Sequence, residues 1–581
     1  MSRSGPQTNP GTPTVHAVHA VHAAREERPR TGDRRSWAAR LALGVGGLVA
    51  VAGAAVVVAL VFGRPSVSVS STGEALFTVH VNGVGTRLRQ VHATADGRPL
   101  TLRPGDGGFV PTARLPQGQP VEVRVMAEAP SWLRWLVGGT VTTAATVRCP
   151  KAVPAAAVVV AASAHRVPVR FDGSVRTVTY AATGGPSHVV HLRHAATVVD
   201  LQVPATIGGS LRLQADPRTW EQPPTRTSSL TWFVSSVNGE PSAVASPAPG
   251  SATASSNGPI TLTFDRPVSK LLGSRRPTLS PAVQGTWRQP SPYELVFTPS
   301  GFGFGPGTSV TVDFGRPVAV ATGATVTTAA AAATYSFQVA PGSLLRMEQL
   351  LAQLHYLPLR FTPAPGAAVP TTFTQEVATL SQPLPGTFSW RWSSTPATLQ
   401  AQWVPGSPNV LVKGALMAFE SSLPTYDGYA LDSETVTQMA TSSTWEALAK
   451  AAATKQLDPS PYSYVYVSKA LPETLTLWEN GANVLTALTN TGIVQDPTTD
   501  GTFPIYVRFT VNYMNGTNPN GTTYHDLVHW INYFHGGQAV HGFVRASYGF
   551  PQSLGCVELP VATAQVAFSD LAIGDLVTVA G

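Results

Sequence analysis

Short apolar segments separated by glycine and proline recur through most of this 581-residue chain and constrain its fold. The sequence contains 52 glycines and 50 prolines, which favour turns and interrupt long helices. Apolar and polar residues alternate over about four to eight positions, which is typical of half-buried strands. A chain of this length holds about three to five domains. We therefore predict a multidomain, mainly β protein, with early strands at 75–81, 121–125, 167–171, 177–180, 198–203, 211–215 and 230–234.

Charge and cysteine content exclude several classes of protein. The formal net charge is +7, of which residues 1–40 contribute +4 through seven arginines against three acidic residues. This mild balance does not indicate a nucleic-acid-binding protein. Two cysteines are too few for a disulfide framework, and we interpret Cys149 as a packed thiol. No Walker or dinucleotide-binding glycine loop occurs, so we expect no cofactor.

The N-terminal 40 residues are rich in proline, threonine, glycine and arginine. This composition predicts a disordered cytoplasmic tail. A Val-His-Ala repeat places His16, His19 and His22 three residues apart. We interpret the repeat as low complexity rather than as a metal site.

Residues 41–62 form an uncharged apolar stretch. A helix of about 20 such residues crosses a bilayer core of about 30 Å. Arginines are concentrated before the stretch, so we predict a single transmembrane helix with the C-terminal bulk outside the cytoplasm. The alternative is a cleaved signal peptide with a cleavage site at residues 52–54.

Three β modules are expected between this stretch and a later helical region. Composition changes place two of them at 66–150 and 151–236, followed by a Ser/Pro/Ala/Gly-rich linker at 237–257. The third, at 258–340, has expected strands at 260–264, 293–297, 308–314 and 335–339. It resembles bacterial immunoglobulin-like domains, which implies a β-sandwich spacer. The resemblance rests on Phe264-Asp-Arg-Pro-Val268, Gly285-Thr-Trp287 and Phe297-Thr-Pro299.

Helical periodicity begins at Ser343, a suitable N-cap, with apolar residues at 344, 347, 350, 351 and 354. We expect a second helix from Lys413 through Phe419 and a third from a capping box at 443–446. The order Leu-x-x-Leu-x-Tyr, Lys-Gly-Ala-Leu-x-Ala-Phe, Asp-Gly and Thr-Trp-x-x-Leu over 342–457 resembles a small peptidoglycan-binding domain. An insertion at 363–408 splits it. The resemblance implies glycan as a partner, and a helical spacer is the alternative.

The residues best suited to chemistry lie near the C-terminus. Cys556 follows His541 by fifteen residues, with Gly555 before the cysteine and Gly542 after the histidine. A thiolate nucleophile needs a base, and small residues let backbone N–H groups approach a reacting carbonyl. Cys556 and His541 are therefore a candidate nucleophile and its candidate base. We also expect the histidine to lower the pKa of the thiol.

Residues 461–581 resemble L,D-transpeptidases of the YkuD type, which cross-link peptidoglycan. The matching residues are Thr491-Gly492, Pro497-Thr498, Gly501-Thr-Phe503, His541-Gly542 and Ser553-x-Gly-Cys556-Val. The resemblance implies a β-rich catalytic domain whose cysteine is acylated by a stem peptide. It also implies site roles: the Gly542 carbonyl orients His541, the N–H groups of Leu554, Gly555 and Cys556 form the oxyanion site, and Ser553 supports the turn.

Two residues depart from the family pattern. Many members have histidine at the position of Leu554 and arginine at the position of Glu558, so the polar lining of the acyl-donor site differs here. A competing pattern, His525-Asp526-Leu-Val-His529, is similar to the HExxH arrangement of metallopeptidases. Aspartate replaces the glutamate, no third ligand is placed, and the surrounding residues favour loops and strands. We therefore predict no metal site.

Together these features predict a membrane-anchored enzyme facing the cell wall. By resemblance, Cys556 takes an acyl group from a tetrapeptide stem, releases D-Ala and passes it to an acceptor amine, which gives a 3→3 cross-link. Stem peptides and glycan are then its partners, and carbapenem-type β-lactams its covalent inhibitors. Two alternatives stay open: an L,D-carboxypeptidase with water as acceptor, and a wall-binding scaffold with a degenerate catalytic domain.

Overall fold

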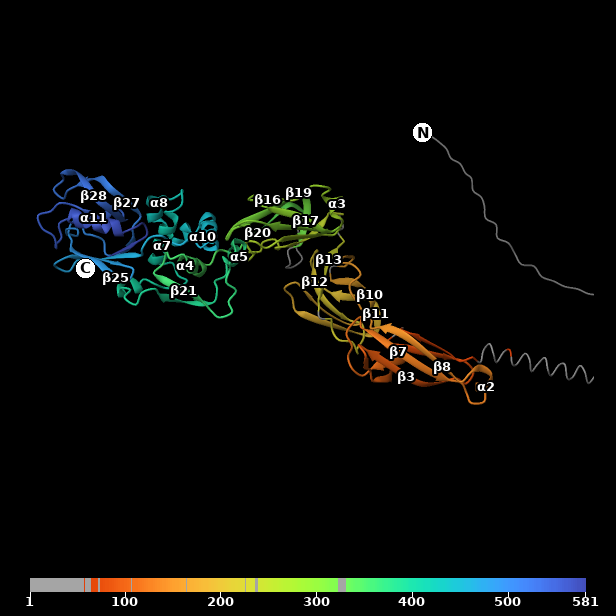
Figure 1. Cartoon of the computed structure of the whole chain (residues 1–581). Helices are drawn as coiled ribbons and strands as arrows, with labels where there is room; N and C mark the ends of the chain where they lie inside the picture. Colours follow the sequence, from red (N-terminus) through yellow and green to blue (C-terminus); the bar gives the residue numbers. More distant parts are fainter. Residues whose placement is uncertain are drawn as a thin grey trace, which may run out of the picture. The chain divides into compact units, whose positions relative to one another are not determined.

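The computed structural model describes Val57 and residues 64–581, except 72–73, 106, 164, 225, 236–238 and 322–330 (Figure 1). The chain divides into two compact units. One comprises Met1–Ala113 with Pro120–Arg148, and the other Arg114–Gln119 with Cys149–Gly581. The tail predicted for residues 1–40 lies outside the described residues. Strands account for 45% of the structure and helices for 14%, so the chain is mainly β.

The predicted fold class is wrong in one part, the transmembrane helix. Within the described ranges, no helix is long and apolar enough to cross a membrane. The longest, α10 (Ser442–Thr454), has 13 residues, whereas a crossing needs about 20. Apolar residues of the described chain are instead divided among short strands and helices that bury one face each. Of the predicted span, 41–62, only Val57 is described.

The first unit consists of small antiparallel sheets. Its elements are β1 (Ser66–Ser70), β2 (Thr78–Asn82), β3 (Arg87–Ala95), β4 (Arg98–Pro99), β5 (Leu102–Gly105), β6 (Gly108–Pro111), β7 (Pro120–Glu128), α2 (Arg134–Val137) and β8 (Thr140–Arg148). The sheets are β4-β3-β7-β8, β1-β2 and β5-β6. Strand β7 alternates as its sequence predicts, with Val121, Val123 and Val125 fully buried.

Two long paired strands dominate the next β module. Its strands are β9 (Val158–Ala161), β10 (Arg166–Ala182), β11 (Ser187–Gln202), β12 (Gly208–Asp216) and β13 (Ser228–Val234). They form one sheet in the order β11-β10-β12-β13-β9. We expected separate strands at 167–171 and 177–180, but β10 runs through both. An irregular register between Arg170 and Thr177 lets it stay paired with β11.

A third β module has an aromatic core. Its elements are β14 (Ser242–Ser246), β15 (Ile260–Phe264), α3 (Val268–Leu271), β16 (Thr278–Ser280), β17 (Gly285–Ser291), β18 (Glu294–Pro299), β19 (Ser309–Ala321) and β20 (Ala332–Gln338). The sheet order is β16-β19-β14-β15-β18-β17, with β20 beside β19. The four strands expected here are present as β15, β18, β19 and β20. Part of the expected linker forms β14, because Ala243 and Ala245 pack into the core.

The helical region combines short helices with a hairpin. Its elements are α4 (Leu344–Gln353), β21 (Leu359–Pro363), α5 (Phe373–Thr379), β22 (Gly386–Trp390), α6 (Ala397–Gln400), α7 (Val410–Glu420), α8 (Gly428–Ser433), α9 (Val436–Met439) and α10. Ser343 caps α4 as predicted, its side chain accepting a hydrogen bond from the Arg346 N–H. The capping box predicted at 443–446 is wrong, because Thr441 caps α10 by accepting from the Thr444 N–H.

The C-terminal domain is built from two sheets and one helix. Its elements are β23 (Ser463–Ser468), β24 (Thr474–Glu479), β25 (Ala482–Leu488), β26 (Gly501–Pro504), β27 (Val507–Thr517), β28 (Thr523–His535), β29 (Gln538–Gly542), β30 (Val557–Leu559), α11 (Val561–Asp570) and β31 (Leu576–Ala580). The sheets are β25-β24-β23-β31-β26 and β27-β28-β29-β30. Apolar side chains from both sheets and from α11 fill a common core.

This domain shares a second core with the helical region. Tyr464, Trp478 and Leu576 belong to the same buried cluster as residues of α4, α7 and α10. The Tyr426 hydroxyl donates a hydrogen bond to the Tyr506 carbonyl at 2.6 Å. Trp392, from the insertion predicted at 363–408, packs edge-on against Trp478 with ring centroids 5.4 Å apart. The insertion therefore contributes to this packing.

Candidate active site

Parallel pairing of β29 with β30 places the predicted nucleophile and base on one face of a sheet. The register aligns Val540 with Val557 and His541 with Glu558. Val540 and Val557 are buried in the core between the sheets. Because side chains alternate along strands, His541, Glu558 and the preceding Cys556 point to the opposite face. The apolar residues at 540 and 557 thus orient the polar residues beside them.

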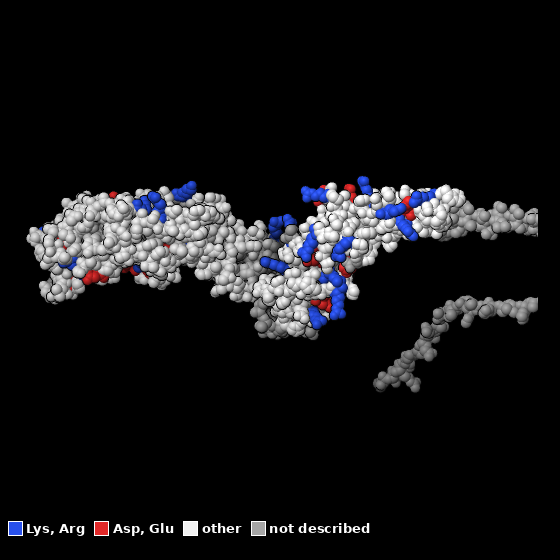
Figure 2. Space-filling model, turned by 90° about the horizontal axis from the view of Figure 1, so that it is seen from below, with Lys and Arg blue, Asp and Glu red and all other residues white. Residues whose placement is uncertain are grey.

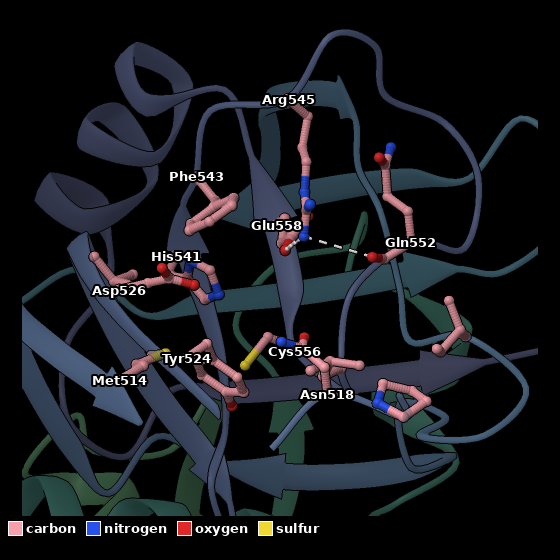
Figure 3. Close-up of a pocket in the computed structure, with 14 residues that line it drawn as sticks. Met514, Asn518, Tyr524, Asp526, His541, Phe543, Arg545, Gln552, Cys556 and Glu558 are labelled. Carbon is pink, nitrogen blue, oxygen red and sulfur yellow. Dashed lines mark hydrogen bonds and ion pairs between the residues drawn. The ribbon is translucent and has the colours of Figure 1, made fainter. Parts of the chain in front are cut away.

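That opposite face forms one wall of a cavity of about 310 Å³ (Figure 3). The β27–β28 hairpin contributes a second wall, which includes Met514, Tyr524 and Asp526. His541 and Cys556 both line the cavity. Figure 3 shows their side chains directed into the space between the two walls. A substrate in this cavity would therefore meet both residues.

Cys556 is half-buried at the start of β30, and its Sγ lies 3.9 Å from the Gly537 carbonyl oxygen. Removal from water raises the pKa of this thiol to about 11, and the negative charge of Glu558 acts in the same direction. We expected His541 to lower this pKa, and that expectation is wrong. The thiol consequently carries its proton at neutral pH.

His541 is buried at the end of β29. Burial lowers the pKa of its ring below the ordinary value, while the Glu558 charge and the Gly542 carbonyl oppose that shift. Nδ1 of the ring is buried and has no hydrogen-bond partner among the described residues. The neutral ring carries no charge that would offset the effect of burial on the pKa of Cys556.

Backbone and side-chain hydrogen bonds fix the turn that carries the cysteine. The Ser553 hydroxyl donates to the Cys556 carbonyl at 2.6 Å, and the Ser553 N–H donates to the Thr491 carbonyl at 3.0 Å. Gly555 has a φ of +95°, which favours glycine. In the described chain, the N–H groups of Leu554 and Gly555 have no hydrogen-bond acceptor. Both are available to a ligand oxygen.

Residues of the Thr491-Gly492 and Pro497-Thr498 motifs pack against this turn and hydrogen-bond to one another and to it. The Thr498 hydroxyl accepts a hydrogen bond from the Gly492 N–H at 2.8 Å. A Cβ at Gly492 would lie 2.1 Å from the Asp496 carbonyl oxygen, so no larger residue fits there. These motif residues position the cysteine turn, although none of them lines the cavity.

An ion pair that the sequence did not predict lies beside the cysteine. Arg545, in the loop after β29, binds Glu558 through two hydrogen bonds, Nε to Oε2 at 2.8 Å and Nη2 to Oε1 at 2.6 Å. The Asn490 amide also donates to Glu558 Oε2 at 3.4 Å. Burial of a lone carboxylate is costly, so Arg545 accounts for the glutamate at a position where the related family often has arginine. Arg545 and Glu558 are thirteen positions apart in the sequence, so no local pattern indicates the pair.

The histidines of the HExxH-like pattern lie on strand β28 and not on a helix. Residues four apart on a strand are separated by about 13 Å, too far to bind one ion. His525 instead stacks on Tyr513 with ring centroids 4.2 Å apart. In the part of the chain that the structure describes, no group of three His, Cys, Asp or Glu residues is arranged to hold a metal ion.

Comparison with known proteins assigns this domain. Residues 462–579 match the family model of the L,D-transpeptidase catalytic domain, YkuD. No curated protein matches the chain significantly. Similar solved structures include LdtMt1 in complex with imipenem, 14% identical over 58% of this chain and 99% of that one, with a TM-score of 0.20. An L,D-transpeptidase from Mycobacterium smegmatis is 14% identical over 59% and 100%, with a TM-score of 0.20. The C442S mutant of the Enterococcus faecium enzyme is 19% identical over 24% and 64%, with a TM-score of 0.20.

The family model, and not these distant structures, carries the assignment. The matched residues include strands β29 and β30, the turn that carries Cys556, and His541. The match confirms the resemblance inferred from the sequence and the predicted class of enzyme. Residues 462–579 of this chain form an L,D-transpeptidase catalytic domain of the YkuD family.

Proposed function

We propose that this chain is a peptidoglycan L,D-transpeptidase that works through an acyl-enzyme on Cys556. The observation that carries the proposal is the placement of His541 and Cys556 on one face of β29–β30, lining the same cavity. The family match at 462–579 supports the reaction class. The substrate would be the stem peptide of peptidoglycan, which places the activity outside the cytoplasm, at the cell wall.

In the first half-reaction, Cys556 attacks the carbonyl carbon of the amide that precedes the terminal D-Ala. The thiol proton passes to His541 through Nε2, because Nδ1 is buried. The N–H groups of Leu554 and Gly555 stabilise the oxyanion. His541 then protonates the departing nitrogen, which releases D-Ala and leaves a thioester.

In the second half-reaction, the amine of an acceptor stem attacks the thioester carbonyl. His541 accepts a proton from the attacking amine and returns it to the sulfur as the C–S bond breaks, which restores the thiol of Cys556. Glu558 and the Gly542 carbonyl both favour the protonated ring. They therefore stabilise the imidazolium that forms in each half-reaction.

The two pKa directions predict an unusual pH profile for acylation. His541 accepts a proton only when neutral, and burial lowers its pKa below the ordinary 6.5. The acylation rate should therefore rise with pH, reach half its plateau below pH 6.5, and stay level across neutral pH, since Cys556 ionises only near 11. Adduct formation with a carbapenem, followed from about pH 5 to pH 10, measures this profile. A rate still rising tenfold between about pH 7 and pH 8 would contradict a neutral His541 base.

Release of D-Ala with and without an acceptor stem tests the proposed reaction. The purified chain is given a tetrapeptide stem alone, or with a second stem that offers a free side-chain amine. Transpeptidation predicts a cross-linked dimer and D-Ala in equal amounts when the acceptor is present. Release of D-Ala with no dimer at any acceptor concentration would favour the carboxypeptidase. Neither product, together with no adduct on Cys556, would favour the scaffold.

A further inference from the structure

Positive charge is scarce in the C-terminal domain. Residues 462–581 contain three basic side chains, Lys469, Arg508 and Arg545, against eight acidic ones, a net charge of 3 − 8 = −5. Figure 2 shows few charged side chains over this part of the molecule on the face drawn. An acidic domain repels a carboxylate, so a substrate with a carboxylate needs a local cation.

Two of the three cations are occupied elsewhere. Lys469 pairs with Asp500 at 2.7 Å. Arg508 donates to the Asn532 side chain at 2.8 Å and to the Phe568 carbonyl. Arg545 is the one lysine or arginine that lines the described cavity. An anion in this cavity would therefore bind at Arg545.

The guanidinium of Arg545 is held in place, and part of its hydrogen-bonding capacity remains available. Nε and Nη2 donate to Glu558, Nη2 also donates to the Gln552 carbonyl at 3.5 Å, and the structure gives Nη1 no hydrogen bond to any described residue. The plane of the group lies over the Phe543 ring, 4.6 Å from its centroid. The side chain of Glu558 is 5% exposed and that of Arg545 is 31% exposed. Both side chains line the cavity, and the guanidinium is the more exposed of the two groups (Figure 3).

The loop backbone adds to this rigidity. The Arg545 N–H donates to the Tyr548 hydroxyl at 3.1 Å, and that hydroxyl donates to the Phe543 carbonyl at 2.5 Å. A guanidinium fixed by its backbone, by stacking and by a carboxylate loses little freedom when it binds a ligand. Such preorganisation is expected at a recognition site.

Spacing connects this cation to the reacting bond. Cys556 and Glu558 are two residues apart on one face, which corresponds to about 7 Å along the strand. In a stem that ends in a D-amino acid, the terminal carboxylate lies two bonds from the scissile amide nitrogen. A stem with its scissile carbonyl at Cys556 would therefore bring this carboxylate close to the guanidinium.

We propose that Arg545, held by Glu558, binds the terminal carboxylate of the acyl-donor stem and so selects donors whose leaving residue carries a free carboxylate. This inference rests on the proposed transpeptidase function. The two N–H donors on Nη1 can bind the carboxylate oxygens, because Nη2 already donates to Glu558 and to the Gln552 carbonyl. Many members of the related family have an arginine at the position of Glu558. In this chain, Arg545 would supply that positive charge from the loop.

Matched substrates test this role. One tetrapeptide stem ends in D-Ala and the other in D-alaninamide, and release of each terminal residue is measured. The wild-type chain should strongly prefer the free carboxylate. Arg545→Met should raise KM for the carboxylate stem by about 10- to 100-fold, while KM for the amide stem stays within about twofold. Arg545→Lys keeps the charge and should recover part of the preference.

The variants also separate recognition from folding. Arg545→Met leaves Glu558 buried without its partner, so Arg545→Met/Glu558→Gln removes both charges and should show the same loss of preference. Equal losses on both stems in the double variant would overturn the proposal, because they indicate a structural ion pair. Unchanged preference would overturn it as well. A wild-type chain that turns over neither stem would refute the proposed function itself, and this inference with it.

Discussion

Replacing Cys556 with alanine should lower D-Ala release by about 10⁴-fold or more. Among the described residues that line the cavity, Cys556 is the one that carries a thiol. The Leu554 and Gly555 N–H groups can polarise a carbonyl, but without the sulfur no acyl-enzyme forms. Quantitative detection of free D-Ala from a tetrapeptide stem measures the loss.

The chain provides a matched control for this result. Cys149 is the other cysteine, and its buried thiol has a pKa raised to about 12 by burial and by the charge of Glu221. Cys149→Ala should release D-Ala at the wild-type rate. Residual D-Ala release in Cys556→Ala at more than about one per cent of wild type would contradict a cysteine acyl-enzyme.

His541→Asn should lower the acylation rate at neutral pH by about 10²- to 10⁴-fold. With a thiol pKa of about 11, only about one molecule in 10⁴ carries a thiolate at pH 7 when no base is present. The variant should therefore regain rate as the solution becomes alkaline, close to tenfold per pH unit below the pKa of the thiol. Adduct formation with a carbapenem at several pH values measures both effects.

His525→Asn is the matched control, because His525 stacks on Tyr513 and does not line the cavity. We expect its acylation rate to stay within about twofold of wild type at neutral pH. A His541→Asn rate that does not change with pH would contradict the role of His541 as a general base. So would a rate equal to that of wild type.

Local signals in the sequence predicted local structure well. Ser343 caps α4 as expected, since an N-cap depends on a side chain and an N–H three residues away. The alternation of apolar and polar residues located β7 and β15, because it also depends only on neighbouring residues. The predicted start of α10 was wrong, because Thr441 and Ser443 are both acceptable caps and the helix begins after Thr441. The transmembrane helix was inferred from hydropathy alone, and no described helix provides one.

The candidate site was predictable in its motif and not in its electrostatics. Spacing and glycine neighbours pointed to Cys556 and His541, which the structure brings to one face. The raised pKa of the thiol was missed, because it depends on burial by residues far away in the sequence. The pairing of Arg545 with Glu558 was also missed, because Arg545 lies in the loop after β29 and Glu558 lies on strand β30.

Intact-mass measurement of the chain after exposure to a carbapenem tests the central claim most directly. We predict one covalent adduct per wild-type chain, the same adduct in Cys149→Ala, and none in Cys556→Ala. Peptide mapping should place the modification on Cys556. An adduct that persists in Cys556→Ala, or a wild-type chain that stays unmodified at any carbapenem concentration, would contradict the assignment of Cys556 as the nucleophile.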